Sequence, residues 1–208
     1  MISTNYSNSA SSPSVVSFKA RFNVDIPVKE LKKLADIQEM FAAKTQHYAG
    51  DTLILTKSKD PSFSNYPVLT TGKVEGSDYK YAHIFENFNE MLESMPESQL
   101  VKKLISYFKM LKKEEELSNY NSRMDKSIEH MRLSLLNNAK RSKYCEAAGN
   151  ETLASRFKVL AENNQRKLIS LQNDKQKGAD KILSNMDKIA AEEPELKYVP
   201  EILRDDAL

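Results

Sequence analysis

Hydrophobic and polar residues alternate along residues 16–24 of the chain. Apolar side chains at Val16, Phe18, Ala20, Phe22 and Val24 point one way, and the polar side chains between them point the other way. A period of two with one polar face predicts a half-buried β-strand. Because the polar face stays in water, we expect the sheet that contains this strand to be largely antiparallel.

The pattern then becomes helical. Apolar residues recur every three or four positions over residues 27–47, which predicts an amphipathic helix packed on the sheet. The apolar face of this helix is expected to hold Val28, Leu31, Leu34, Ile37 and Phe41. Three short strands are predicted next, at residues 52–57, 67–74 and 78–85, with turn signals between them. A short helix at 86–95 closes this head, whose strand order the sequence does not fix.

A long region without helix breakers follows the head. No proline occurs between Pro96 and Pro194, and the only glycines in that stretch are Gly149 and Gly178. This predicts long helices, the first of which runs over 98–117 and is expected to bend or be capped at the polar patch 118–122. Its apolar stripe, continued beyond the patch, consists of Val101, Leu104, Ile105, Phe108, Leu111, Leu117, Met124, Ile128, Met131, Leu135 and Ala139.

The clearest turn in the chain is Ala148-Gly149-Asn150. Glycine provides the left-handed stop of one helix, and asparagine caps the start of the next. The second apolar stripe is predicted to contain Leu153, Phe157, Leu160, Asn164, Leu168 and Leu171, and after a weaker patch near Gly178 it continues with Ala179, Ile182, Met186 and Ile189. Two long helices joined by so short a turn must lie antiparallel.

These elements predict an α+β fold, with a small β-α-β-β-β head followed by a long antiparallel helical hairpin. We expect a flexible Ser/Asn-rich leader at 1–14, the head domain at 15–95, a coiled-coil-like stalk at 97–192, and an acidic tail at 193–208. A leader ahead of a head-plus-hairpin layout is typical of bacterial or phage proteins.

Composition narrows the class of protein only a little. The net charge of +2 gives no global signature of nucleic-acid binding, and the single cysteine, Cys145, excludes an intrachain disulfide. Neither a secretory signal peptide nor a membrane-spanning apolar run is recognisable, so we expect a cytoplasmic protein that does not bind membranes. The alternative location is that of a secreted effector whose leader is not cleaved.

Candidate chemistry is sparse. No phosphate-binding loop, calcium loop or zinc-ligand spacing is present, so no metal or cofactor is expected. The three histidines, His47, His83 and His130, are far apart in sequence, and the run Glu114-Glu115-Glu116 is expected to be a solvated helix surface. The interpretation as an enzyme is therefore disfavoured. If the protein is an enzyme, its site is expected in the head, around Tyr79, Tyr81 and His83.

Basic residues gather in two runs on the first long helix. They are Lys102, Lys103, Lys109, Lys112 and Lys113 in the first run, and Lys140, Arg141 and Lys143 in the second. Such cations bind phosphates, so nucleic-acid binding through the face 102–143 is one alternative function, although no recognised binding motif accompanies them. They are also the residues that we would first test for contact with a protein partner.

The leading hypothesis is a non-enzymatic interaction or scaffold protein. The apolar stripes serve either as the intramolecular core of the hairpin or as a seam offered to another protein or a second copy of the chain. Asn164, which lies within the second stripe, could specify the register of such a seam. The methionines along the helices would supply adaptable contacts.

Overall fold

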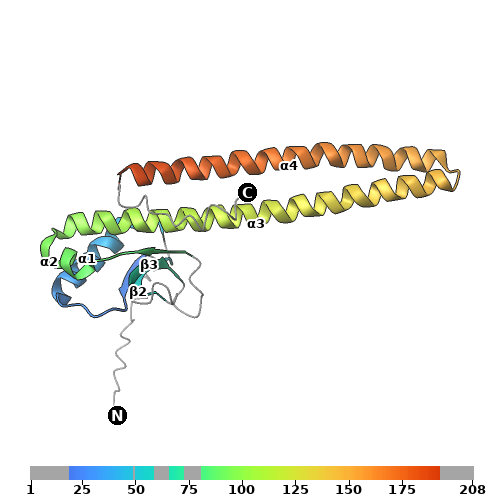
Figure 1. Ribbon diagram of the computed structural model, residues 1–208. Helices are drawn as coiled ribbons and strands as arrows, with labels where there is room; N and C mark the ends of the chain where they lie inside the picture. The colour runs from blue at the N-terminus through green and yellow to red at the C-terminus, as the bar shows by residue number, and fades with distance from the viewer. Residues whose placement is uncertain (1–18, 49, 59–65, 73–80, 193–208) are drawn as a thin grey trace, which may run out of the picture.

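The chain forms a small mixed sheet with two short helices, and a helical hairpin extends far beyond them (Figure 1). The computed structural model describes residues 19–48, 50–58, 66–72 and 81–192. The elements follow one another as β1 (Arg21–Val24), α1 (Leu31–Lys44), β2 (Thr52–Lys57), β3 (Pro67–Thr71), β4 (Ala82–Ile84), α2 (Phe88–Ser94), α3 (Glu97–Ala147) and α4 (Glu151–Glu192). The α+β class and the hairpin are thus confirmed.

The four strands are ordered β1-β2-β3-β4 across the sheet. β1 and β2 are parallel because α1 connects them, whereas the β2–β3 and β3–β4 pairs are antiparallel. Ala20 and Phe22 are buried, as the alternation of the first strand requires. Some predicted features lie outside the described residues. They are residues 16–18 of that strand, Tyr79 of the predicted strand at 78–85, the leader at 1–14 and the tail at 193–208.

Helix α1 is shorter than predicted. It begins at Leu31, which is exposed, so the predicted apolar face starts only at Leu34. It ends at Lys44, and His47 therefore lies just beyond the helix. Within the helix, Phe41 is fully buried, and its ring contacts those of Phe22 and Phe108 at centroid distances of 5.9 and 5.5 Å. Aromatic contacts of this kind join the sheet, α1 and α3 in one core.

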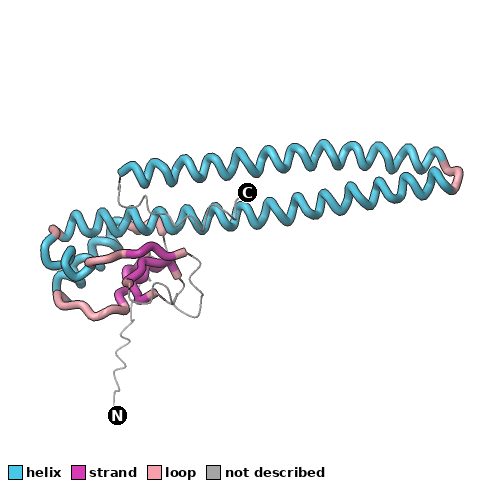
Figure 2. Tube along the Cα trace, in the orientation of Figure 1, coloured by secondary structure: helices cyan, strands magenta, loops and turns pink. Residues whose placement is uncertain are grey.

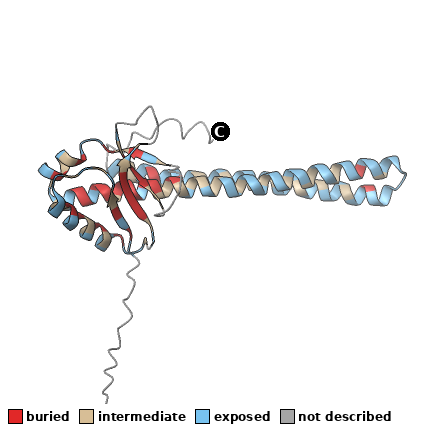
Figure 3. Ribbon diagram, turned by 90° about the horizontal axis from the view of Figure 1, so that it is seen from below, coloured by how far each residue is buried: buried red, intermediate tan, exposed pale blue. Residues whose placement is uncertain are grey.

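The first turns of α3 complete the core of the head. Leu100, Leu104, Phe108 and Leu111 recur at helical spacing and are fully buried in the same cluster as the sheet residues Leu53, Leu55 and Leu69. The far end of α4 adds Ile182 and Met186 to this cluster. The burial map in Figure 3 shows the result, with buried residues concentrated in the head and few along the hairpin. The predicted domain boundary at residues 95–97 stays a prediction.

The hairpin consists of two uninterrupted helices (Figure 2). At 1.5 Å per residue, α3 with its 51 residues is about 76 Å long and α4 with its 42 residues about 63 Å long. Gly149 has a φ of 72°, and the Leu153 amide donates a hydrogen bond to the Asn150 side chain at 3.1 Å, which confirms the predicted turn and cap.

The expected helix cap at residues 118–122 is wrong, since α3 continues through this patch. The reason is tertiary. The Tyr120 hydroxyl donates a hydrogen bond to the backbone carbonyl of Asp174 on α4 at 2.7 Å, and the side chain lies directly over Gly178. The polar patch at 118–122 and the region near Gly178, where the helical pattern of the sequence is weak, therefore face each other across the hairpin.

Candidate interaction surface

The distal hairpin, which we define as residues 124–176, is held together by one seam. Its seam positions are spaced alternately by three and four residues, and all of them are buried or half-buried. On α3 they are Met124, Ile128, Met131, Leu135, Asn138, Ser142 and Cys145, and on α4 they are Ala154, Phe157, Ala161, Asn164, Leu168, Leu171 and Lys175.

Polar contacts join the two helices along the seam. Asn164 donates a hydrogen bond to the Ser134 hydroxyl at 2.9 Å, and the Ser142 hydroxyl donates to the Ala154 carbonyl at 3.0 Å. Lys175 forms an ion pair with Asp125 at 2.7 Å. Asn164, which was expected to set the register of a seam offered to another protein, makes its hydrogen bond with α3 of its own chain.

The seam is narrow, and many large apolar side chains lie outside it. Within the distal hairpin only Ser142 and Ala154 are buried, in contrast to the dense core of the head (Figure 3). The exposed apolar residues of this region are Leu133, Leu136, Tyr144, Leu153, Val159, Leu160 and Ile169. In the described part of the chain, the hairpin consists of two helices only, and no third helix or strand covers these side chains.

Leu153 and Leu160 were expected in the seam, and this expectation is wrong. Their exposed fractions are 39% and 47%, whereas Ala154 is buried and Ala161 half-buried at the seam positions beside them. The seam selects the small residue of each pair, which leaves both leucines on the flank of α4.

The two leucines belong to a patch near the end of the hairpin. We define the tip patch as Arg141, Leu153, Arg156, Phe157 and Leu160. The four residues on α4 line a hollow of about 620 Å³ together with Ser155 and Val159. From α3, the Arg141 guanidinium lies 5.7 Å from the centre of the Phe157 ring, a cation–π contact that places a positive charge beside the apolar surface.

The predicted basic residues fall into two separate groups. Lys140, Arg141 and Lys143 are exposed near the tip. Lys113, the last residue of the other run, precedes Lys140 by 27 positions, so the two groups are about 40 Å apart along α3. The first group lies beside the head, where Lys112 contacts Asp51, and the second lies near the tip of the hairpin. Within the first run, Lys102 and Lys109 are exposed, Lys112 and Lys113 are half-buried, and Lys103 is buried.

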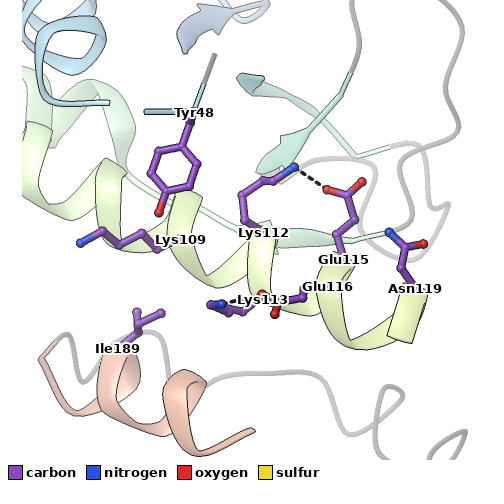
Figure 4. A pocket seen from close by; sticks show the side chains of 8 residues that line it. All are labelled: Tyr48, Lys109, Lys112, Lys113, Glu115, Glu116, Asn119 and Ile189. Carbon is purple, nitrogen blue, oxygen red and sulfur yellow. Dashed lines mark hydrogen bonds and ion pairs between the residues drawn. The ribbon is translucent and has the colours of Figure 1, made fainter. Parts of the chain in front are cut away.

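A second hollow, of about 390 Å³, lies between the head and the end of α4 (Figure 4). Lys109, Lys112 and Lys113 line it from α3, Tyr48 lines it from the head, and Ile189 lines it from α4. Glu115, Glu116 and Asn119 complete the lining.

Two of the three lysines that line this hollow, Lys112 and Lys113, have acidic partners. Lys112 contacts Glu115 at 2.7 Å and Asp51 at 3.2 Å, and Lys113 pairs with Glu116. Burial alone lowers the pKa of Lys112, but the hydrogen bonds and negative charges of Glu115 and Asp51 outweigh it, so the pKa is raised. These pairs offset much of the positive charge that a phosphate would need.

The residues proposed for an enzyme site are Tyr79, Tyr81 and His83. His83 is buried, and its Nε2 lies 2.9 Å from Oε1 of Glu114 on α3. Neither hollow described above is lined by Tyr81 or His83, and Tyr79 lies outside the described residues.

The assignment of Glu114 to a solvated surface is wrong. Glu114 is buried because it follows Tyr107 and Leu111 on the face of α3 that covers the sheet. Its spacing from these two residues was the available signal. Its polar side chain, which argued for solvent, instead has a buried hydrogen-bond partner in His83.

Other candidate groups are isolated. Among the described residues, no three His, Cys, Asp or Glu side chains converge in a way that could hold a metal ion. Cys145 is a free, half-buried thiol in the seam. No helix in the described part of the chain is both long and apolar enough to cross a membrane.

Comparison with known proteins gives no match. No protein-family model fits the sequence, no curated protein is significantly similar to it, and no solved structure matches the fold at a significant level.

Proposed function

We propose that the protein is a non-enzymatic interaction or scaffold protein that binds another protein through its distal hairpin. The observation that carries this proposal is the set of large apolar side chains left exposed on a two-helix stalk that extends away from the core. Exposed apolar clusters rimmed by polar residues are typical of protein-binding surfaces.

The shape of the molecule supports the same function. The head shares one core with the first turns of α3 and the C-terminal end of α4, which form the base of the hairpin. This core anchors the hairpin, and the tip lies far from the head (Figure 1). The distal hairpin contributes nothing to that core, so its exposed side chains outside the seam are free to serve a partner.

Photo-crosslinking from single positions tests the proposal. A photoreactive phenylalanine analogue replaces Tyr144 near the tip, which is 78% exposed, or Leu31 in the head, which is 70% exposed. In cells that make the protein, we expect one discrete protein adduct from position 144 and none of that size from position 31.

Three other outcomes would count against this function. They are no adduct from position 144, the same adducts from both positions, or an adduct with nucleic acid alone. The last result would favour the alternative of nucleic-acid binding through the basic face 102–143, which should weaken steeply as salt is raised. Light scattering on the purified protein distinguishes self-association from a foreign partner.

A further inference from the structure

The tip patch has the form of a helix-binding ridge. Leu153, Phe157 and Leu160 are spaced i, i+4 and i+7 along α4, so the two exposed leucines and the half-buried seam residue Phe157 between them form one row at the edge of the seam. Apolar side chains at this spacing form the stripe by which one helix packs along another. A third helix that packs along this row would cover all three side chains.

The charges around the patch define the partner further. Residues 132–167, which form the end of the hairpin, hold eight Lys and Arg but only three Asp and Glu. Two of the arginines, Arg141 and Arg156, belong to the patch itself. An approaching helix with acidic residues beside its apolar stripe is therefore attracted, and a basic one is repelled.

We propose that the tip patch binds an amphipathic, acidic helix of another protein, so that three helices pack together at the tip. This inference rests on the proposed function, because it names the chemistry of the partner that the distal hairpin binds. A second copy of the chain is disfavoured as the occupant, since two strongly basic tips would repel each other.

A lipid surface is also disfavoured. The residues that would enter a bilayer first are those of the turn, Ala148, Gly149 and Asn150, and none of them is a large apolar residue. The apolar row lies along the side of the hairpin, where the length of a helix can contact it.

Two designed peptides test the charge preference. Both carry the same leucine stripe over three heptads, with Asp and Glu at the flanking positions of one and Lys and Arg at those of the other. We expect fluorescence anisotropy to show binding of the acidic peptide to the full-length protein and no binding of the basic one. Exchange of Arg141 and Arg156 for glutamine should weaken binding and flatten its dependence on salt.

Matched substitutions test the position of the site. The double variant Leu153→Ser/Leu160→Ser should weaken binding of the acidic peptide by about tenfold or more, because about 1.4 kcal/mol of lost apolar contact suffices for that change. Ile169→Ser is the control. Ile169 is 52% exposed on the same helix, but it follows Leu153 by 16 positions and so points roughly 160° away from it. Circular dichroism verifies that the variants stay helical.

The inference is overturned if both peptides bind equally, if Ile169→Ser weakens binding as much as the double variant, or if phosphatidylserine vesicles bind and the acidic peptide does not. If the acidic peptide fails to bind while position 144 still crosslinks to one protein, the acidic-helix partner is wrong and the interaction function stands. If the crosslink is also absent, both are wrong.

Discussion

A contact between Tyr120 and Gly178 shows how single residues adapt the two helices to each other. A Cβ atom at position 178 would collide with the Tyr120 ring and hydroxyl, so only glycine leaves room for this side chain. Glycine inside a helix costs about 1 kcal/mol relative to alanine. Here that cost is offset by the hydrogen bond from Tyr120 to the Asp174 carbonyl and by the packing of the ring against the edge of the core.

The effect of Gly178→Ala should therefore depend on residue 120. In the wild-type chain we expect this substitution to lower the free energy of unfolding by about 1 kcal/mol. Tyr120 must leave its position over residue 178, and the contacts that it loses there outweigh the gain in helix propensity. In a Tyr120→Ala background the same substitution should raise the free energy of unfolding by up to about 1 kcal/mol. Urea denaturation of the four proteins measures both values. An equal effect in the two backgrounds would show that the contact is unimportant.

Between the helices, the repeat of the seam determines which residues meet. The pairs Asp125–Lys175, Ser134–Asn164 and Ser142–Ala154 follow one antiparallel register along the distal hairpin. Every heptad of α3 faces a heptad of α4, and these heptads lie outside the core of the head. The length of the hairpin should therefore be adjustable in whole heptads.

Removal of residues 127–133 together with residues 165–171 tests this register. The paired deletion takes one heptad from each helix and keeps the Ser134–Asn164 contact, so we expect a folded protein that is about 10 Å shorter. Small-angle scattering measures the length, and circular dichroism the thermal unfolding.

Deletion of residues 127–133 alone is the control for the paired deletion. It shifts α3 by one heptad against α4, which separates Ser134 from Asn164 and displaces the turn. We expect lower helicity and earlier thermal unfolding. If the single and paired deletions proved equally stable, the polar contacts would not set the register.

For the molecule as a whole, the sheet and the long helices depend on each other. The fully buried residues of α3 lie in one cluster with β2, β3 and α1, and α4 joins the same cluster only near its C-terminal end, at Ile182 and Met186. The contact of His83 Nε2 with Glu114 Oε1 adds a buried polar link between β4 and α3. The head therefore should not retain its stability once α3 loses its packing.

Two leucines on α3 allow a matched test of this dependence. Leu104→Ala should lower the free energy of unfolding by about 2–5 kcal/mol and speed amide hydrogen exchange in β3, because it opens a cavity against the sheet. Leu136→Ala, at a position that is 49% exposed on the distal hairpin, should change the free energy by no more than about 0.5 kcal/mol. Unchanged exchange in β3 of the Leu104 variant would mean that the head folds independently of α3.

The sequence by itself determined the elements whose signal is local. The strand at 52–57, the turn at 148–150 and the antiparallel hairpin follow from alternation, from Gly149 and Asn150, and from the repeat of apolar positions. These features depend on neighbours within a few residues, which the sequence shows directly.

Only the tertiary structure decided which of two adjacent residues enters the seam, and thereby placed Leu153 and Leu160 on the surface and Ala154 in the interior. It likewise kept α3 continuous through residues 118–122, buried Glu114 opposite His83, and separated the two basic runs. The physical reason is the same in each case. Burial depends on the partner that packs against a helix face. Contacts between residues far apart in the chain determine which face of the helix turns toward that partner.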